Sequence, residues 1–542
     1  MKFVMIALSL CIMVFASIAP AEAKAGLVQR IEGAIARGER TVMVEKGDYA
    51  LDLPEGRDAY FRFAGACDLT IDFSGSRLWG KVKSRMFDLS GCTNVTIRNV
   101  TVDYPFSLPY TQARIVSVDA ARNWDVEILN GYPEPDAAQI APGARIWPVQ
   151  VYSRDGTKLV NPMRFRDGIR IERLSGTRYH VSGGLDRRGE VGDVAVWSLG
   201  ESVRKTANCA FYLMACKGCL LEDCTVYATP MGCGFAEAAA DRNTYRRCVL
   251  TRCPPEADPV ERDGLRLRSG NHDAFNSRRS FVGPVIEQCR FGYHCDDDVN
   301  ISGYFGIVTR QEGRFLRVCP FGGFVPCAAG DTCQVMTDSG DCPPDVTAVS
   351  CRPDGVPTEG EKRFFREYEF YPGIVATISK AYRIEIDRDL DLPRGSVIIS
   401  NRRQGNGFVI RDSAFGPNRA RGLLLKASNG LVENNTIVGV EGHPIMVATE
   451  VQWLEGGCSS GLAIVGNRMK DNGGGILISG NNMANNPLPC GAHRAIAVER
   501  NVVDSPGPAL RAVGCSGLKL KGNRFTSERG ETLELINCKG RE

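Results

Sequence analysis

Apolar and polar residues alternate in short segments that recur along most of the chain, which predicts β-strands rather than helices. In each segment, two or three alternating apolar residues precede a small Asn, Cys or Ser, and another apolar residue follows two positions later. The segments are NVTIRNVTV (94–102), CLLEDCTVY (219–227), NTYRRCVL (243–250), PVIEQCRF (284–291), FVIRDSAF (408–415), LVENNTIV (431–438), LAIVGNRM (462–469), IAVERNVV (496–503) and LKLKGNRF (518–525). The small residues that share this register are Asn99, Cys224, Cys248, Cys289, Ser413, Asn435, Asn467, Asn501 and Asn523.

The spacing of these segments indicates a repeat architecture. Adjacent copies are 24 residues apart from 224 to 248, and 22 apart both from 413 to 435 and from 501 to 523. One β unit in every 20–30 residues, roughly, is typical of a solenoid. Asn side chains stacked in register can hydrogen-bond from coil to coil. We therefore predict an all-β fold, a right-handed parallel β-helix, with a multi-sheet sandwich as the alternative.

Two stretches, 104–205 and 304–405, interrupt the repeat. They contain β-like runs, including FFREYEF (364–370), but lack the small residue at the shared register. We interpret both as inserted small β-barrel-like modules beside the solenoid. The remaining units are then 24–103, the cap and first coils; 206–303, the catalytic coils; and 406–542, the C-terminal coils.

The N-terminus has the composition of an export signal. Lys2 precedes an apolar run at 3–18, and Ala-Glu-Ala at 21–23 resembles a cleavage site. We predict a signal peptide at 1–23 and a mature chain that is exported, periplasmic or secreted, with no membrane span after cleavage. An uncleaved anchor helix is the alternative. The apolar residues that follow at helical spacing predict a short helix covering the open end of the first coil; they are Leu27, Val28, Ile31, Ala34 and Ile35.

The chain contains 21 cysteines, of which only Cys11 lies in the signal. Thiols in an exported protein predict disulfides, although their pairing cannot be read from the sequence. Five crowd one Pro/Gly-rich stretch and suggest a stapled loop: Cys319, Cys327, Cys333, Cys342 and Cys351. CKGC at 216–219 resembles a zinc or redox pair, but two buried small residues or a local disulfide is favoured because the chain has no second CxxC.

Charge and motifs exclude several classes of function. Lys and Arg total 66 against 63 Asp and Glu, a net charge of +3, so no basic excess indicates nucleic acid. The five histidines are scattered, which argues against a His-rich metal centre. The chain has no nucleophile elbow, P-loop or dinucleotide fingerprint in the required context. We therefore predict no cofactor and no metal.

An acidic cluster carries the candidate chemistry. Asp273 in HDAFNS (272–277) precedes Asp296 by 23 residues and Asp297 by 24, close to one coil. Residues one coil apart stack roughly 4.8 Å from each other. Neighbouring carboxylates repel, so at least one should have a raised pKa and act as an acid while another activates water. Inverting glycoside hydrolysis needs this pair, about 6.5–9.5 Å apart. A solvated turn or a calcium site is the alternative.

Two further carboxylates complicate this assignment. Strand alternation puts Asp296 and Asp298 on one side and Asp297 on the other, unless the chain bends there. Asp263, 33 residues before Asp296, is a rival first carboxylate, but its spacing does not match one coil.

The order of motifs resembles glycoside hydrolase family 110, β-helical exo-α-galactosidases that act on terminal α-1,3-linked galactose. Asp273-Ala-Phe-Asn-Ser and Asp296-Asp297-Asp298-Val-Asn300 resemble the family's D-A/G-F-H-S and D-D-A-I-N. The resemblance covers most of the chain, with both insertions at the expected points. Further similar segments are DYPFSLPYTQARI (103–115), TVYATPMGCGFAEAAADRNTYRRC (225–248), NRARGLLLKASNGLVENNTI (418–437) and VATEVQWLEGGCSSGLAIVGN (447–467).

The resemblance implies roles by matching position. Asp296 corresponds to the general acid, and Asp273 and Asp297 to the pair that holds and activates water. The sugar contacts implied by alignment with family segments are Glu237, Arg419, Arg421, Trp453 and Glu455. His272, Asn276 and Asn300 are further candidate sugar contacts because they lie beside these aspartates in the sequence. Three positions depart from the family pattern and bear on the substrate: Asn276 replaces a His, Asp298 an Ala, and Glu450 an Asp.

The function predicted from the sequence is an exported inverting exo-glycosidase acting on a glycan or oligosaccharide, an α-1,3-galactosidase by resemblance. The alternatives are a polysaccharide lyase or a polygalacturonase-like hydrolase on the same fold, or a non-catalytic glycan-binding β-helix. The sequence leaves the oligomeric state open, with a dimer among the alternatives.

Overall fold

The computed structural model describes residues 26–141, 149–161, 169–183, 189–199, 208–368, 372–481 and 486–540. The predicted signal peptide, 1–23, lies outside these residues. Within the described ranges, no helix combines the length and apolar character that a membrane crossing requires.

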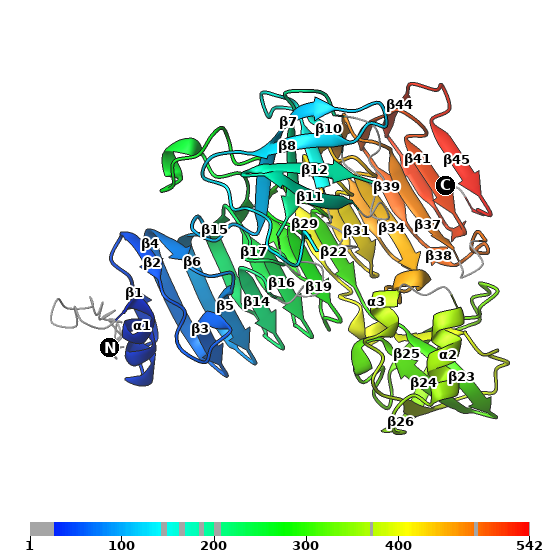
Figure 1. Ribbon diagram of the computed structural model, residues 1–542. Helices are drawn as coiled ribbons and strands as arrows, with labels where there is room; N and C mark the ends of the chain where they lie inside the picture. The colour runs from blue at the N-terminus through cyan, green and yellow to red at the C-terminus, as the bar shows by residue number, and fades with distance from the viewer. Residues whose placement is uncertain are drawn as a thin grey trace, which may run out of the picture.

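Two long parallel sheets form the body of the molecule, and the chain alternates between them as it winds (Figure 1). The nineteen-stranded sheet contains β1 (Thr41–Met43), β2 (Asp48–Leu51), β4 (Cys67–Gly80), β6 (Thr93–Asp103), β15 (Leu220–Val226), β17 (Thr244–Arg246), β18 (Val249–Leu250), β20 (Val285–Glu287), β21 (Arg290–Phe291), β29 (Val409–Arg411), β30 (Ala414–Phe415), β32 (Leu431–Glu433), β33 (Thr436–Val438), β35 (Ala463–Val465), β36 (Arg468–Lys470), β39 (Ala497–Glu499), β40 (Val502–Ser505), β43 (Lys519–Lys521) and β44 (Arg524–Ser527). The eleven-stranded sheet contains β3 (Ala59–Ala64), β5 (Arg85–Ser90), β14 (Phe211–Met214), β16 (Phe235–Ala238), β19 (Phe275–Arg278), β22 (Val299–Ser302), β31 (Leu423–Lys426), β34 (Ile445–Glu450), β37 (Ile476–Asn481), β41 (Leu510–Val513) and β45 (Leu533–Ile536). A short pair, β38 (His493–Arg494) and β42 (Cys515–Ser516), completes two of the coils. The predicted parallel β-helix is confirmed.

Alternate residues of each strand face the interior and form one continuous apolar core. Phenylalanines on consecutive coils stack along it: ring centroids of Phe61 and Phe87 are 5.0 Å apart, those of Phe87 and Phe211 4.8 Å, and those of Phe211 and Phe235 5.2 Å. Each stacked pair contributes about 0.5–1.5 kcal/mol beyond its apolar burial. The stack therefore helps to fix the register of the coils on which the site is built.

The small residue of the repeat follows a bend in the nineteen-stranded sheet. The residue before it has a left-handed φ, as Asp223 and Arg247 do before Cys224 and Cys248. The first segment departs from the predicted register, because Val100 and not Asn99 pairs with Cys224. Asn99 is itself the left-handed residue (φ 58°), and its side chain donates to Asp72 at 2.9 Å.

The predicted asparagine ladder is present in the C-terminal coils. The Nδ2 of Asn435 donates to Oδ1 of Asn467 at 3.0 Å, Asn467 to Asn501 at 3.0 Å, and Asn501 to Asn523 at 3.1 Å. Each acceptor also takes the backbone N–H of the preceding ladder residue. The ladder therefore satisfies buried backbone groups at the bend as well as linking the coils.

Cysteines occupy the same register in the central coils and are free thiols. The Sγ of Cys224, Cys248 and Cys289 donates to carbonyls of the preceding coil at 3.5, 3.4 and 3.3 Å. Cys216 and Cys219 of the CKGC sequence are likewise buried and free. The disulfides expected from the cysteine count, including a stapled loop at 319–351, are absent from the described residues. Here the sulfur serves as a small interior group.

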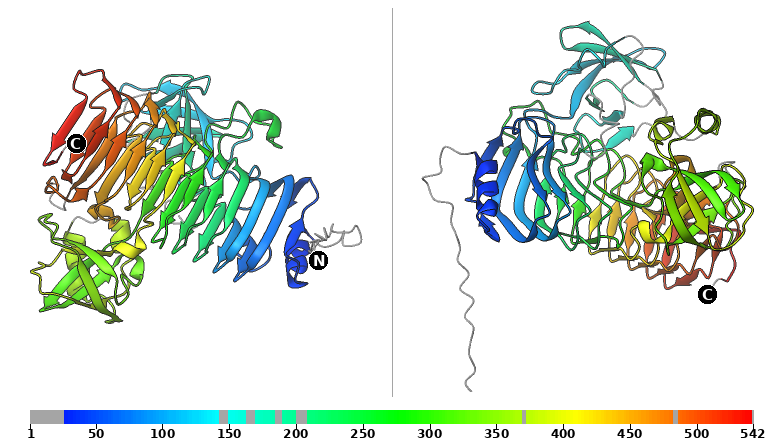
Figure 2. Two further views of the ribbon diagram at one scale, coloured as in Figure 1. Left: turned by 180° about the vertical axis from the view of Figure 1, so that it is seen from behind. Right: turned by 90° about the horizontal axis from the view of Figure 1, so that it is seen from below.

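The N-terminal helix α1 (Leu27–Ala36) lies across the first coil (Figures 1 and 2). Leu27, Val28, Ile31 and Ala34 are buried in the solenoid core, as their helical spacing predicted. The helix covers the apolar end that the first coil would otherwise expose.

The first interruption of the repeat is an antiparallel sheet of seven strands, in the order β10-β9-β13-β7-β8-β12-β11. Its end strands β10 and β11 do not pair with each other among the described residues, so this module is an open sheet there rather than the expected barrel. Its strands are β7 (Tyr110–Val118), β8 (Trp124–Ile128), β9 (Val149–Tyr152), β10 (Leu159–Asn161), β11 (Arg170–Ser175), β12 (Arg178–Ser182) and β13 (Val194–Ser198).

The second interruption contains a closed barrel of six strands, seen beside the C-terminal half of the solenoid (Figure 2). Its strands are β23 (Gly306–Glu312), β24 (Phe315–Pro320), β25 (Thr332–Met336), β26 (Val346–Pro353), β27 (Tyr382–Ile386) and β28 (Val397–Ser400). Helices α2 (Glu359–Glu367) and α3 (Pro372–Val375) belong to the same insertion and lie between β26 and β27 in the sequence. The start of FFREYEF is thus helical, not β, because Thr358 and Glu361 form a capping box that begins α2. Short 3₁₀ helices lie at η3 (Pro255–Ala257), η4 (Phe321–Gly323), η5 (Asn401–Arg403) and η6 (Val451–Trp453).

Candidate active site

Three aspartates meet where two neighbouring strands of the eleven-stranded sheet begin. Asp273 lies just before β19, and Asp296 and Asp297 lie just before β22. These strands pair in parallel with Phe275 opposite Val299, so the coil spacing brings the three side chains together. One carboxylate oxygen from each lies within 4.8 Å of the others. We call Asp273, Asp296 and Asp297 the aspartate cluster.

Asp273 is the member whose ionisation is most disfavoured. Its side chain accepts Nδ2 of Asn276 at 2.5 Å and the backbone N–H of Asp297 at 3.3 Å. Burial raises the pKa of Asp273 well above its ordinary value, and the charges of Asp296 and Asp297 raise it further. Within the aspartate cluster, the charged form of Asp273 is therefore the least favoured by its surroundings.

Asp297 is buried but held by a cation. Its carboxylate receives two hydrogen bonds from Arg421, Nε to Oδ1 at 2.8 Å and Nη2 to Oδ2 at 2.9 Å. Burial raises the pKa of Asp297 to about 6, with Arg421 opposing the rise and Asp296 adding to it. Above that pH, Asp297 is an ionised group in a fixed orientation.

Asp296 is the most accessible member of the aspartate cluster. Its side chain is 21% exposed, against 2% for that of Asp297. Arg419 lies nearby, with Nη2 3.6 Å from Oδ1 of Asp296. Arg419 is itself oriented by a hydrogen bond of 2.8 Å from Nε to the carbonyl oxygen of Cys295.

Asp298 turns away from the aspartate cluster. Its Oδ1 lies 2.7 Å from Nε2 of His294, and both side chains are fully buried. Strand alternation does not apply to Asp296 and Asp298, because the chain bends through 295–298, the exception that the sequence left open, and regular strand geometry begins only at Val299. The bend removes the ambiguity about which carboxylates belong to the site.

Asn276 and Asn300 lie beside each other on the outer face of the eleven-stranded sheet, in register between β19 and β22. The Oδ1 atom of each is buried and has no hydrogen-bond partner in the structure. Buried amide oxygens are normally paired. Both are therefore open acceptors next to the aspartate cluster.

Glu237 lies inside the solenoid rather than on the outer face. Its carboxylate accepts hydrogen bonds from Ser277 (2.8 Å), Ser280 (3.1 Å), Asn243 (3.1 Å) and Tyr245 (3.2 Å). These interior contacts account for both of its oxygens, and no contact with the aspartate cluster is seen among the described residues.

The other predicted sugar contacts differ in their surroundings. His272 is buried and directly precedes Asp273. Trp453, in η6, is partly buried against an apolar cluster that includes Phe305 at the start of the barrel. Glu455 lies 2.6 Å from Nζ of Lys426. Trp453 therefore has a packing role in addition to any contact with a ligand.

An ion-pair network extends from the aspartate cluster and includes two residues that were not predicted as site members. Nη1 of Arg421 donates to Glu450 at 2.8 Å, and Nζ of Lys426 lies 2.6 Å from Glu450. Glu450 was singled out only as a departure from a family pattern, and Lys426 was missed. They lie on the neighbouring parallel strands β31 and β34, which pair at a spacing of 22 residues, so their separation of 24 residues is close to one coil.

The aspartate cluster has the oxygen donors that a hard cation prefers, and it is the one group with metal-ligand spacing in the described ranges. Its surroundings do not fit such an ion well. Arg421 already occupies both oxygens of Asp297, and Arg419 places a second positive charge beside Asp296. Calcium also takes six to eight oxygen ligands, more than three aspartates supply with one oxygen each.

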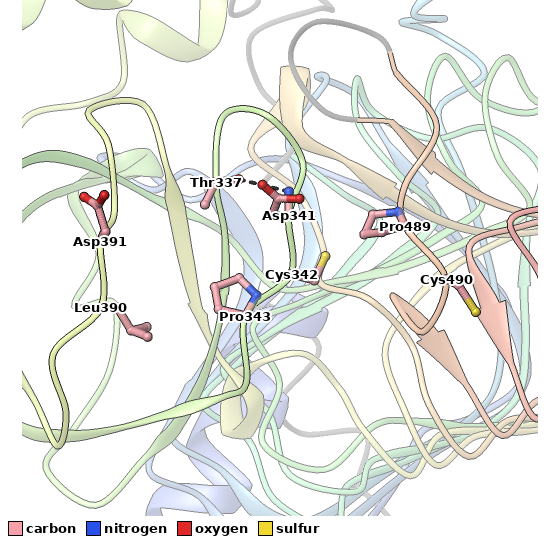
Figure 3. Close-up of a pocket in the computed structure, with 8 residues that line it drawn as sticks. All are labelled: Thr337, Asp341, Cys342, Pro343, Leu390, Asp391, Pro489 and Cys490. Carbon is pink, nitrogen blue, oxygen red and sulfur yellow. Dashed lines mark hydrogen bonds between the residues drawn. The ribbon is translucent and has the colours of Figure 1, made fainter.

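A separate pocket lies between the barrel and the C-terminal coils (Figure 3). It is lined by Thr337, Asp341, Cys342, Pro343, Leu390, Asp391, Pro489 and Cys490. No member of the aspartate cluster lines it, so the carboxylate chemistry is located elsewhere.

The chain is similar to several known proteins. A family model described as "Right handed beta helix region" matches residues 390–488. The α-1,3-galactosidase B of Bacteroides thetaiotaomicron is 24% identical over 422 residues, which cover 74% of this chain and 62% of that protein. The chain thus spans less than two thirds of that relative's length.

Solved structures similar to this one share little sequence with it. The polygalacturonase of Erwinia carotovora ssp. carotovora matches with a TM-score of 0.38 and 9% identity, over 95% of this chain and 94% of that one. The catalytic domain of a GH87 α-1,3-glucanase in complex with nigerose matches with a TM-score of 0.36 and 8% identity, over 97% and 70%. The strand topology and the family model together identify the chain as a right-handed parallel β-helix protein.

Proposed function

We propose that the protein is an inverting exo-glycosidase that removes terminal α-1,3-linked galactose from a glycan. The observation that carries this proposal is the aspartate cluster, in which three carboxylates from adjacent coils approach within 4.8 Å. The 24% identical relative is an α-1,3-galactosidase, which supports the choice of sugar and linkage.

In the proposed reaction, Asp296 donates a proton to the glycosidic oxygen because it is the most accessible of the three. Asp273 and Asp297 hold a water molecule. As its oxygen attacks the anomeric carbon from the opposite face, Asp297 takes one of its protons and the bond from the anomeric carbon to the glycosidic oxygen breaks. The transition state carries positive charge on the sugar ring, which the ionised carboxylates stabilise. Asp297 suits the role of base because Arg421 fixes its orientation.

The spacing of the aspartate cluster is shorter than that of many inverting enzymes. Oxygen atoms within 4.8 Å contrast with the roughly 6.5–9.5 Å between the two carboxyl groups that leaves room for water in most inverting glycosidases. Retaining enzymes have about 5–5.5 Å. The proposal of inversion therefore rests on the family resemblance, and the anomeric configuration of the product is the decisive measurement.

The proposed substrate contacts fall into two groups: residues whose polar atoms or ring are open to a ligand, and residues whose polar atoms are already bonded within the protein. Asn276 and Asn300 offer open acceptors to sugar hydroxyls, and Arg419 lies at the more exposed end beside Asp296. Trp453 offers a partly buried aromatic ring for stacking on a sugar. His272 is proposed through its adjacency to Asp273. Glu237, Arg421 and Glu455 act indirectly, because protein groups already occupy their polar atoms.

The test is to incubate the mature chain with α- and β-linked galactosides and uronates and to follow the anomeric proton of the product by NMR. We expect β-galactose to be released first from an α-galactoside. Asp296→Asn should lower kcat by about 10²–10⁴-fold, the usual contribution of a general acid. Asp263→Asn is the control, because it removes the rival carboxylate and should leave kcat unchanged.

Each other outcome points away from the proposal. Initial release of α-galactose would replace inversion by retention, and full activity of Asp296→Asn would remove the assigned acid. An unsaturated product that absorbs ultraviolet light and disappears with chelator would indicate a lyase, with the aspartate cluster binding calcium.

A further inference from the structure

Lys426 is a cation in a fully buried position close to the aspartate cluster but not in contact with it. It is on the outer side of β31, in register with Ser302, and its side chain is entirely covered. Its Nζ lies 2.6 Å from Glu450 and 2.6 Å from Glu455. A buried ammonium is strongly unfavourable without such partners. The two carboxylates and the lysine therefore form one unit.

This unit continues directly to the proposed base. Glu450 contacts Lys426 through Oε2 and Arg421 through Oε1, and Arg421 in turn holds both oxygens of Asp297. The order Asp297, Arg421, Glu450, Lys426, Glu455 alternates in charge at every step. In such an arrangement each cation is shared by two carboxylates, so the loss of one member leaves its neighbours unbalanced.

Backbone hydrogen bonds fix the end of this ion-pair series that lies farthest from Asp297. Glu450 and Glu455 exchange backbone hydrogen bonds of 3.1 and 3.2 Å, which closes a short loop over Lys426. The loop is bonded to the segment that enters the barrel, with Gly456 N–H to Gly303 O at 3.0 Å and Phe305 N–H to Leu454 O at 2.9 Å. Gly456 has a left-handed φ of 80°, and a side chain there would collide with Lys426.

We propose that Lys426 is a positioning residue for the reaction: it holds Glu450 where Glu450 orients Arg421, and Arg421 thereby fixes the carboxylate of Asp297. The inference rests on the proposed function in that Asp297 is taken as the group that activates water. In this proposal, Glu455 and the loop at 450–456 anchor the ion-pair series to the barrel rather than bind sugar directly.

The test compares Lys426→Met with Arg317→Met. Arg317 is the matched control because, within the barrel, it also joins two carboxylates, Glu361 at 2.8 Å and Asp354 at 2.5 Å. Both variants should lower the melting temperature. Only Lys426→Met should lower kcat, by about 10–100-fold with KM changed less than about twofold, since small misplacements of a reacting group have effects of this size.

A double variant separates positioning from stability. In Lys426→Met with Glu450→Gln, the uncompensated carboxylate at 450 is removed, so the melting temperature should partly recover. The kcat should stay low, because Glu450→Gln removes the carboxylate that orients Arg421. Recovery of kcat together with stability would overturn the proposal. If Lys426→Met does not fold, Glu450→Gln alone tests the same link and should lower kcat.

A crystal structure of Lys426→Met, or of Glu450→Gln, tests the inference without reference to turnover. We expect the Arg421 guanidinium and the Asp297 carboxylate to be displaced by about 1 Å, the scale of misplacement that affects catalysis. Unmoved groups would overturn the positioning role, even if the wild-type protein is an active galactosidase. Displaced groups in a chain that hydrolyses no glycoside would instead overturn the proposed function alone.

Discussion

Asp297 shows how the surroundings of one residue set the conditions under which this site can work. Burial and the charge of Asp296 favour its protonated form, while the two hydrogen bonds from Arg421 favour the ionised form. The result is a pKa of about 6, above the ordinary value for an aspartate. A base with this pKa is ionised near neutrality and remains basic enough to accept a proton from water.

The pH dependence of the reaction follows from this value. The base must be ionised, so kcat/KM should fall as the pH drops below about 6, approaching tenfold per pH unit. Because Asp273 and Asp296 interact with Asp297, the apparent pKa of this acidic fall in kcat/KM belongs to the aspartate cluster as a whole. The measurement is a pH profile of kcat/KM between 4 and 8, with buffer controls. A fall in kcat/KM with its midpoint near pH 4, where ordinary carboxyl groups titrate, would contradict the assignment of the buried Asp297 as base.

For single residues, the sequence did not predict the direction of a side chain where that direction depends on a local bend of the backbone. Coil spacing brought Asp273, Asp296 and Asp297 together correctly, because parallel strands keep their register. It did not reveal that Asp298 turns to His294, since alternation holds only within a regular strand. Nor did it reveal that Glu237 faces inward, where its hydrogen-bond partners come from other segments.

The ladder at the bends of the nineteen-stranded sheet is the element that ties successive coils together. Asn467 is fully buried and uses both ends of its amide: Oδ1 accepts from Asn435, and Nδ2 donates to Asn501 and to the carbonyl of Val432. Sequence predicted this ladder because the small residue recurs at a fixed register. It also placed Cys224, Cys248 and Cys289 at this register, but it did not predict that they are free, buried thiols, because composition alone cannot separate an interior cysteine from a disulfide.

Removal of a central ladder residue should be costly. Asn467→Ala leaves the backbone N–H of Asn435 and the carbonyl of Val432 buried without these partners. We expect a loss of about 2–4 kcal/mol in the free energy of unfolding, because each buried unsatisfied group costs about 1–3 kcal/mol. Denaturant titration followed by circular dichroism measures the loss.

Asn523, the last member of the ladder, is the matched control, because it is less buried and has a ladder partner on one side only. Asn523→Ala should therefore cost less than Asn467→Ala. Equal losses for the two variants would show that the ladder does not act through burial.

In the whole molecule, the parts of the fold contribute differently to the site. The solenoid brings the three aspartates together by stacking consecutive coils, and the barrel meets the site through the loop at 450–456. The positions of both insertions were visible in the sequence as breaks in the repeat. Their architecture was not, because the open seven-stranded sheet and the closed barrel differ in long-range pairing that strand patterns do not encode.

The capping helix α1 carries the last prediction, because a solenoid has two ends that stacking cannot bury. Ile31 is fully buried between α1 and the first coil. Ile31→Asp should detach the helix, since an unpaired carboxylate at this position and the lost apolar contact together cost about 3 kcal/mol or more. The uncovered coil end would then present apolar surface and an unpaired strand edge to other molecules. We expect a lower melting temperature and concentration-dependent association in sedimentation velocity. Gln29→Asp, which adds the same charge on the exposed face of the same helix, should remain unchanged in both measurements. A monodisperse Ile31→Asp variant that melts like the wild type would mean that the first coil is stable without its cap.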